Sequence, residues 1–154
     1  MILITHMLAG AIIGSKIPSY PGIILLALIS HYILDKIPHW DYFPENISKL
    51  NAKGWIFFAF EVFADLLAGL ILIWLILGLN QDPIRILTGT FFGILTDGLM
   101  ILNIVTREKN KFLKWAQNIH SKVHFQNYKK TPLSQRLFWE TFIAGLLIAL
   151  AFII

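Results

Sequence analysis

Seven ionisable side chains lie inside the apolar segments of this sequence, all near the same end of their segments. They are His6, His31, Asp35, Glu61, Asp65, Asp97 and Glu140. An aspartate at the centre of a membrane helix costs roughly 2.5–3.5 kcal/mol on insertion scales, so an intramembrane acid indicates a functional site by default. The nearby cations are Lys36 and Arg136. Bound metal ions are therefore the expected partners of this polar layer.

The spacing of these residues indicates that their side chains converge. His31 and Asp35, Glu61 and Asp65, and His120 and His124 are each four residues apart. Residues four apart project from one face of a helix, so each pair can present two ligands to one ion. The predicted metal ligands are His6, His31, Asp35, His39, Asp41, Asp65, Asp97, His120 and His124.

Glycines continue two of the ligand-bearing faces. Gly10 and Gly14 follow His6 at steps of four residues, and Gly89 and Gly93 precede Asp97 at the same step. Small residues allow helices to approach closely, as ligands from different helices require.

The ligand types limit the metal. The chain has no cysteine, which excludes thiolate metal sites, iron–sulfur clusters and cysteine nucleophiles. Imidazole and carboxylate ligands suit zinc, manganese or iron, and zinc or manganese is expected. The ligands suffice for two ions, which can clamp the attacking and leaving oxygens of a phosphoryl displacement.

Structural explanations compete for several of these residues. His39 could be an interfacial residue, and His120 and His124 could lie on the solvated face of a basic helix. Glu61 could be a protonated residue at a helix contact, and Glu140 is expected to pair with Arg136 four residues earlier.

The elements that must position these residues are predicted to be membrane helices. The chain is 56% hydrophobic and only 14% charged, whereas soluble domains carry about 25% charged residues. The fold class is all-α: a single integral membrane domain over 1–154, with about five transmembrane or re-entrant helices and one interfacial amphipathic helix. The predicted long spans are 55–79, 83–105 and 133–154, the shorter apolar segments are 1–14 and 22–37, and the amphipathic helix covers 107–127.

Charge asymmetry predicts the orientation. Eleven of the 13 lysines and arginines fall on one side of the predicted spans. By the positive-inside rule, the N-terminus and the loops 38–54 and 107–131 are cytoplasmic, and the chain is integral to the cell membrane. The net charge of +4 is not a nucleic-acid signal, because the basic residues cluster between spans.

The N-terminal third resembles a known family, the inner-membrane metal-dependent hydrolases of the LexA-regulated YdjM type. The resemblance rests on Thr5-His6 with Gly10 and Gly14, on Ser30-His31 with Leu34-Asp35, and on Pro38-His39-Trp40-Asp41. It implies a membrane-embedded hydrolase. His39 stands where that family usually has an aspartate, and the family's His-Arg-x-x-Thr-His-Ser segment is missing. Either His120 and His124 replace its ligands, or the metal chemistry differs.

Together these features predict a metal-dependent hydrolase of a phospholipid or lipid-like phosphoester at the cytoplasmic interface. Glu61 is the predicted general base or acid, and Lys111, Lys114 and Lys122 form a basic rim for an anionic headgroup. The expected partners are membrane lipids and a lipid-like substrate. The alternatives are a divalent-metal or proton transporter, and a non-catalytic metal- or haem-binding membrane module.

Overall fold

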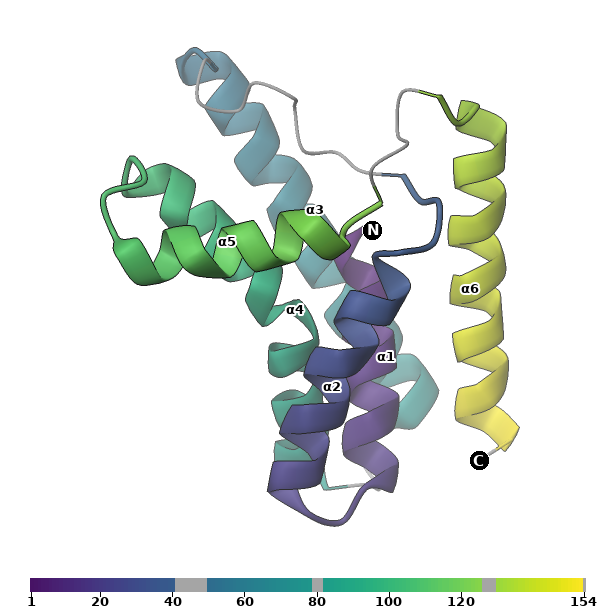
Figure 1. Cartoon of the computed structure of the whole chain (residues 1–154). Helices are drawn as coiled ribbons and strands as arrows, with labels where there is room; N and C mark the ends of the chain where they lie inside the picture. The colour runs from purple at the N-terminus through teal and green to yellow at the C-terminus, as the bar shows by residue number, and fades with distance from the viewer. Residues whose placement is uncertain (41–49, 79–81, 126–129, 154) are drawn as a thin grey trace.

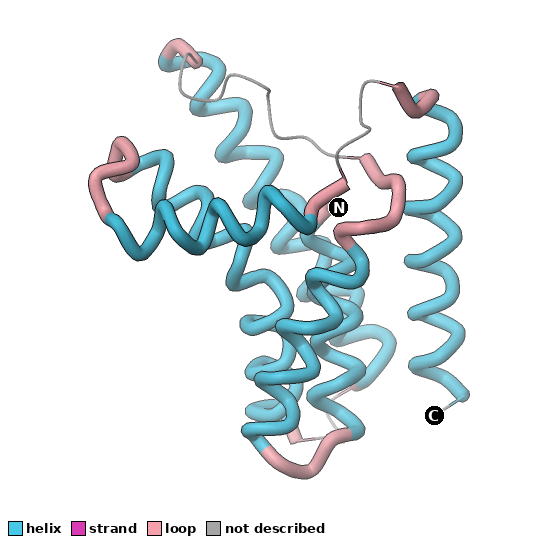
Figure 2. Tube along the Cα trace, viewed as in Figure 1, coloured by secondary structure: helices cyan, strands magenta, loops and turns pink. Residues whose placement is uncertain are grey.

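The computed structural model describes residues 1–40, 50–78, 82–125 and 130–153. These residues form helices joined by short loops, and no strand occurs among them (Figure 2). The helices are α1 (Leu3–Lys16), α2 (Tyr20–Leu34), α3 (Ala52–Leu77), α4 (Pro83–Val105), α5 (Lys111–Val123) and α6 (Leu133–Ile153). The prediction of an all-α fold is therefore confirmed.

Three of the helices are long and apolar enough to cross a membrane. They are α3, α4 and α6, with 26, 23 and 21 residues, and a span needs about 20. The shorter apolar helices α1 and α2 have 14 and 15 residues. Pro21 lies within the first turn of α2, where its missing N–H costs no helical hydrogen bond, so α2 begins earlier than the predicted residue 22.

Helix α1 occupies the centre of the bundle, with α2, α3, α4 and α6 around it (Figure 1). Nine of its residues are buried, including Thr5, His6 and Met7. The outer helices show the reverse pattern, because large apolar side chains such as Ile56, Phe57 and Phe60 on α3 are more than half exposed. An apolar exterior around a partly polar centre suits a bilayer, where hydrocarbon tails cover apolar side chains.

Helices α1 and α4 cross with their backbones in contact. A Cβ atom added at Gly10 would overlap the carbonyl oxygen of Gly89, and one added at Gly89 would overlap that of Gly10. Gly14 meets the Arg85 carbonyl group and Gly93 meets the His6 carbonyl oxygen in the same way. The expected close approach of the two glycine faces is thus present, and it brings the His6 end of α1 beside the Asp97 region of α4.

Helix α5 lies across the bundle at the end where α2 and α4 finish (Figure 1). It is shorter than the predicted 107–127, because Arg107 and Glu108 adopt positive φ angles of 55° and 56° in the preceding turn. The Asn110 side chain then caps α5 by accepting hydrogen bonds from the backbone N–H groups of Phe112 and Leu113. The apolar residues Phe112 and Trp115 remain exposed, whereas Leu113 and His120 are buried.

The glycine crossing can be tested by adding one methyl group. Gly89→Ala should destabilise the protein by about 1–3 kcal/mol, because overpacking a tight contact displaces backbone atoms. A lower thermal midpoint in detergent would report this. Gly98→Ala is the matched control on α4, because a Cβ there meets nothing within 4 Å. Equal midpoints for the two variants would contradict the close crossing.

Candidate metal centre

The C-terminal end of α2 carries the first two residues of the centre. His31 and its neighbour one turn later, Asp35, are 0% and 1% exposed. The Nδ1–H of His31 donates to the carbonyl oxygen of Gly93 on α4 over 2.8 Å. This hydrogen bond directs Nε2 of the same ring toward Asp35, the arrangement usual for histidines that bind metals.

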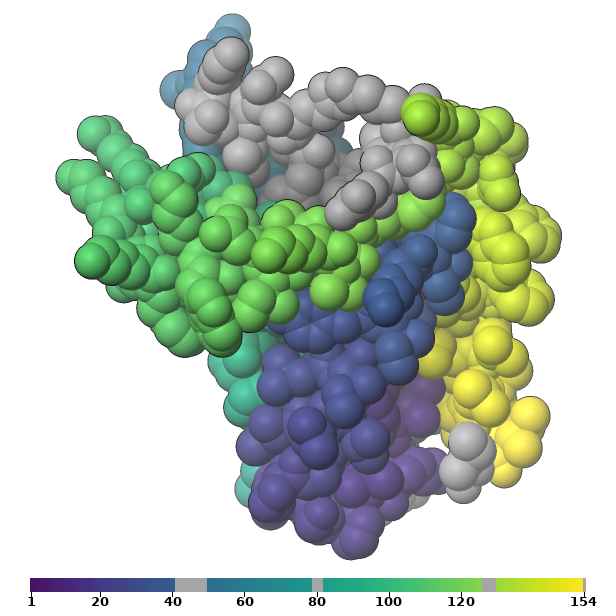
Figure 3. Space-filling model, viewed as in Figure 1, coloured from purple at the N-terminus to yellow at the C-terminus, as the bar shows by residue number. Residues whose placement is uncertain are grey.

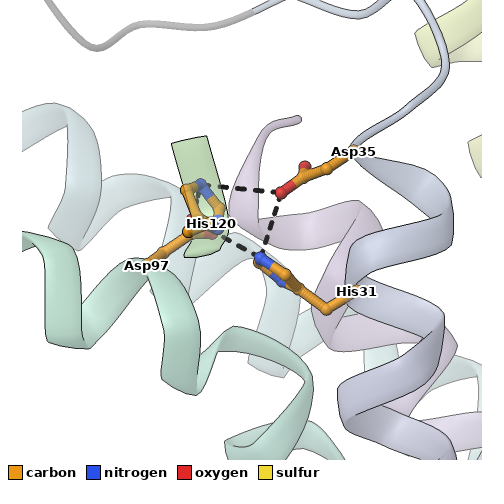
Figure 4. Close-up of side chains that lie close together, drawn as sticks. All are labelled: His31, Asp35, Asp97 and His120. Atoms are coloured by element: carbon orange, nitrogen blue, oxygen red, sulfur yellow. Dashed lines mark ion pairs between the residues drawn. The ribbon is translucent and has the colours of Figure 1, made fainter. Parts of the chain in front are cut away.

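Four buried residues from three helices form the first group of possible ligands. Nε2 of His31 lies 3.0 Å from Asp35 Oδ2 and 3.8 Å from Asp97 Oδ1. Nε2 of His120, on α5, lies 3.7 Å and 3.8 Å from the same two oxygens. Figure 4 shows the four side chains pointing toward one another. One ligand atom from each lies within 4.8 Å of the others, so the group could hold a metal ion.

A second group shares Asp35 with the first. His39, just beyond α2, and His124, at the C-terminal end of α5, complete it. The Nδ1–H of His39 donates to the Ile37 carbonyl oxygen over 2.7 Å, and its Nε2 lies 3.2 Å from Nε2 of His124. His39 is therefore oriented by a backbone carbonyl group in the same way as His31.

The arrangement of atoms in the first group is compatible with a bound cation. With its proton on Nδ1, a neutral His31 directs the lone pair of Nε2 at the Asp35 carboxylate, so two acceptors face each other at 3.0 Å. Both atoms are buried, and within the described residues neither makes a hydrogen bond of good geometry. A second proton on His31 or a metal ion would resolve this contact, and a metal ion would also offset the buried charge of Asp97.

The histidines outside the apolar spans are held in the form that binds metals. Burial lowers the pKa of His120 to about 4 and that of His39 to about 3. Both imidazoles are neutral at pH 7 as a result, and the neutral ring supplies the lone pair that a metal ligand needs.

Four residues of the predicted polar layer contact the start of α1, namely His31, Asp35, Asp65 and Glu140. His6 Nε2 lies 3.1 Å from Asp35 Oδ1, and the His6 ring lies 4.1 Å from that of His31 between centroids. The backbone N–H of Leu3 donates to Asp65 over 2.7 Å, and the Thr5 hydroxyl donates to Glu140 over 2.6 Å. Glu140 thus contacts α1, and its expected pairing with Arg136 stays a prediction. Helix α1 borders the centre and connects α3 and α6 to it.

Glu61 and the predicted rim lysines lie outside both groups. Glu61 is half-buried on α3, one turn from Asp65. Lys111, Lys114 and Lys122 are exposed on α5. Asp41 falls outside the residues that the structure describes. The structure therefore brings together His31, Asp35, His39, Asp97, His120 and His124.

Two hydrogen bonds that the sequence did not indicate hold α5 over the centre. Asn103, fully buried near the end of α4, donates a hydrogen bond to Gln117 on α5. In the sequence, the only sign of this contact is that Asn103 is a polar amide near the end of an apolar helix. The backbone N–H of Phe125 also donates to the Asp35 carbonyl oxygen over 2.7 Å, which fixes the end of α5 against α2. Figure 3 shows α5 lying against α2 at this end of the molecule.

The comparisons with known proteins leave these residues as the basis for function, since no family model, curated protein or solved structure matches the chain.

Metal content of variants tests the first group. Substituting even an outer-shell partner commonly lowers metal affinity by about 10–100-fold, so Asp97→Asn and His31→Gln should each lower it at least that much. Elemental analysis of purified protein after dialysis measures the effect. Glu140→Gln removes a carboxylate from the same layer and should leave the metal content unchanged, because Glu140 accepts a hydrogen bond from Thr5 and belongs to neither ligand group. Folded, monodisperse wild-type protein that binds no divalent metal would refute the assignment.

Proposed function

We propose that this protein is a membrane-embedded, metal-dependent hydrolase of a phospholipid or lipid-like phosphoester. The observation that carries the proposal is the buried group of His31, Asp35, Asp97 and His120 at the end of the bundle crossed by α5. Its ligands are those preferred by zinc or manganese. The short motifs around His6, His31 and His39 that resemble inner-membrane hydrolases of the YdjM type favour the same assignment.

The surroundings of the group suit a lipid headgroup. Phe112 and Trp115 are exposed on α5, and exposed lysines lie on the same helix. A helix with exposed aromatic residues and lysines favours the interface between headgroups and acyl chains, where anionic lipids attract it. His120 reaches the buried group from this helix, so the proposed reaction takes place just below headgroup level.

The residues of the chain have distinct proposed roles. A divalent ion bound by the group would lower the pKa of a water molecule and polarise a phosphoryl oxygen. Lys111, Lys114 and Lys122 attract the anionic headgroup. Glu61 transfers a proton: it shares a face of α3 with Asp65, and Asp65 contacts the start of α1 beside the centre.

We further propose that the end of the bundle with α5 is cytoplasmic and that the protein resides in the cell membrane, because this end carries most of the lysines and arginines. Asn118→Cys tests this orientation, and the chain has no other cysteine. A membrane-impermeant thiol reagent should label the exposed position 118 only after the cytoplasmic face is opened. Labelling of this position in intact cells would contradict the proposed orientation.

Hydrolysis is tested with metal-loaded protein and a panel of phospholipids and polyprenyl phosphates. Wild-type protein should release product from at least one of them. Glu61→Gln should retain metal and lower kcat by about 10²–10⁴-fold, the usual contribution of a general acid or base. Neutralising the three rim lysines should raise KM in a salt-dependent way, because charges beyond about 8–10 Å are screened at physiological salt.

One outcome would contradict the role of Glu61, and another would contradict the hydrolase itself. Unchanged turnover of Glu61→Gln would remove Glu61 from the reaction. No turnover of any phosphoester, together with metal flux in proteoliposomes, would identify the protein as a transporter. Glu140→Gln is the matched carboxylate control and should keep both metal and turnover.

A further inference from the structure

We infer that the two ligand groups form a single two-metal centre in which the Asp35 carboxylate bridges both ions. The first ion is held by His31, Asp97 and His120, and the second by His39 and His124, each together with Asp35. This inference rests on the proposed metal site and adds the number of ions and the division of ligands between them.

The two groups adjoin through Asp35 and through neighbouring imidazole rings. Centroid distances are 5.4 Å from His31 to His120, 5.2 Å from His120 to His124 and 4.7 Å from His124 to His39. The pair His120 and His124, four residues apart on α5, is thus divided between the groups. Oδ2 of Asp35 faces the first group, whereas Oδ1 lies 3.1 Å from His6 Nε2 and 3.3 Å from the Met1 amino group. A carboxylate can bridge two ions through one oxygen or through both.

The backbone fixes this division. The hydrogen bond from the Phe125 N–H to the Asp35 carbonyl oxygen places the residue after His124 against the residue shared by both groups. His39 is 0% exposed, and its Nδ1–H is used by the Ile37 carbonyl oxygen. Nε2 of His39 therefore presents a lone pair to His124, over a distance of 3.2 Å. The facing nitrogens are joined either by one proton or by one shared metal ion.

The two groups also differ in the number of protein ligands that each can offer to an ion. The first group has four possible protein ligands, two of which are carboxylates. The second group has three possible protein ligands, one of which is the shared Asp35. Catalytic metal sites commonly use three protein ligands and leave a further position for water or substrate. The second ion should therefore bind more weakly and carry the open position, next to the end of α5.

Manganese provides a direct probe, because neighbouring Mn²⁺ ions interact magnetically. Metal-free wild-type protein titrated with Mn²⁺ should bind about two ions per chain and show an exchange-coupled electron paramagnetic resonance spectrum, since the ions of two-metal sites lie about 3.5–4 Å apart. His39→Gln and His124→Gln should each bind about one ion, with the spectrum of isolated Mn²⁺. Asp35→Asn should lose both ions. Asn118→Ala, at an exposed position on α5, is the matched control and should keep the coupled spectrum.

The wild-type spectrum decides the question even where a variant fails to fold. A single bound Mn²⁺ without coupling would overturn the inference, as would a coupled spectrum that persists in both His39→Gln and His124→Gln. Turnover measured on the same samples separates this result from the proposed function. Two coupled ions without hydrolysis would support the centre and contradict the hydrolase, and one ion with hydrolysis would do the opposite.

Discussion

The rest of the structure depends on the buried carboxylate of Asp35. A charge removed from water is stable only when partners and hydrogen bonds compensate for its lost hydration. Asp35 obtains contacts from three helices: His6 of α1 at 3.1 Å, His31 of α2 at 3.0 Å and His120 of α5 at 3.7 Å. The Met1 amino group lies 3.3 Å from the same carboxylate. Residues of α1, α2 and α5 thereby meet at the two oxygens of one carboxylate at the end of α2.

The glycine crossing of α1 and α4 makes these contacts geometrically possible. With no Cβ at Gly10 and Gly89, the two backbones touch, and the His6 and Asp97 regions approach each other. The Gly93 carbonyl group of α4 then accepts the hydrogen bond that orients His31. Helix packing and ligand orientation are therefore parts of one arrangement, and a methyl group in the crossing would disturb both.

Helix α5 has one exposed side and one side that faces the two ligand groups. Its exposed residues Phe112 and Trp115 suit the interface, while His120 and His124 reach the two ligand groups. The Asn103–Gln117 hydrogen bond and the backbone bond to Asp35 hold the helix in place. Helix α5 thus covers the buried carboxylates of Asp35 and Asp97 at this end of the bundle.

The sequence by itself determined the helices and the existence of a polar layer, because hydropathy and helical periodicity are local properties. It indicated α3, α4 and α6 as possible spans, the glycine faces, and α5 as an amphipathic helix. Only the tertiary structure decided which members of the layer meet. Asp65 and Glu140 have the same chemistry as Asp97, yet they contact Leu3 and Thr5 of α1. The division of His120 and His124 between two groups was equally inaccessible, because the rotation of each helix about its axis and the crossing angles between helices depend on packing across the whole bundle.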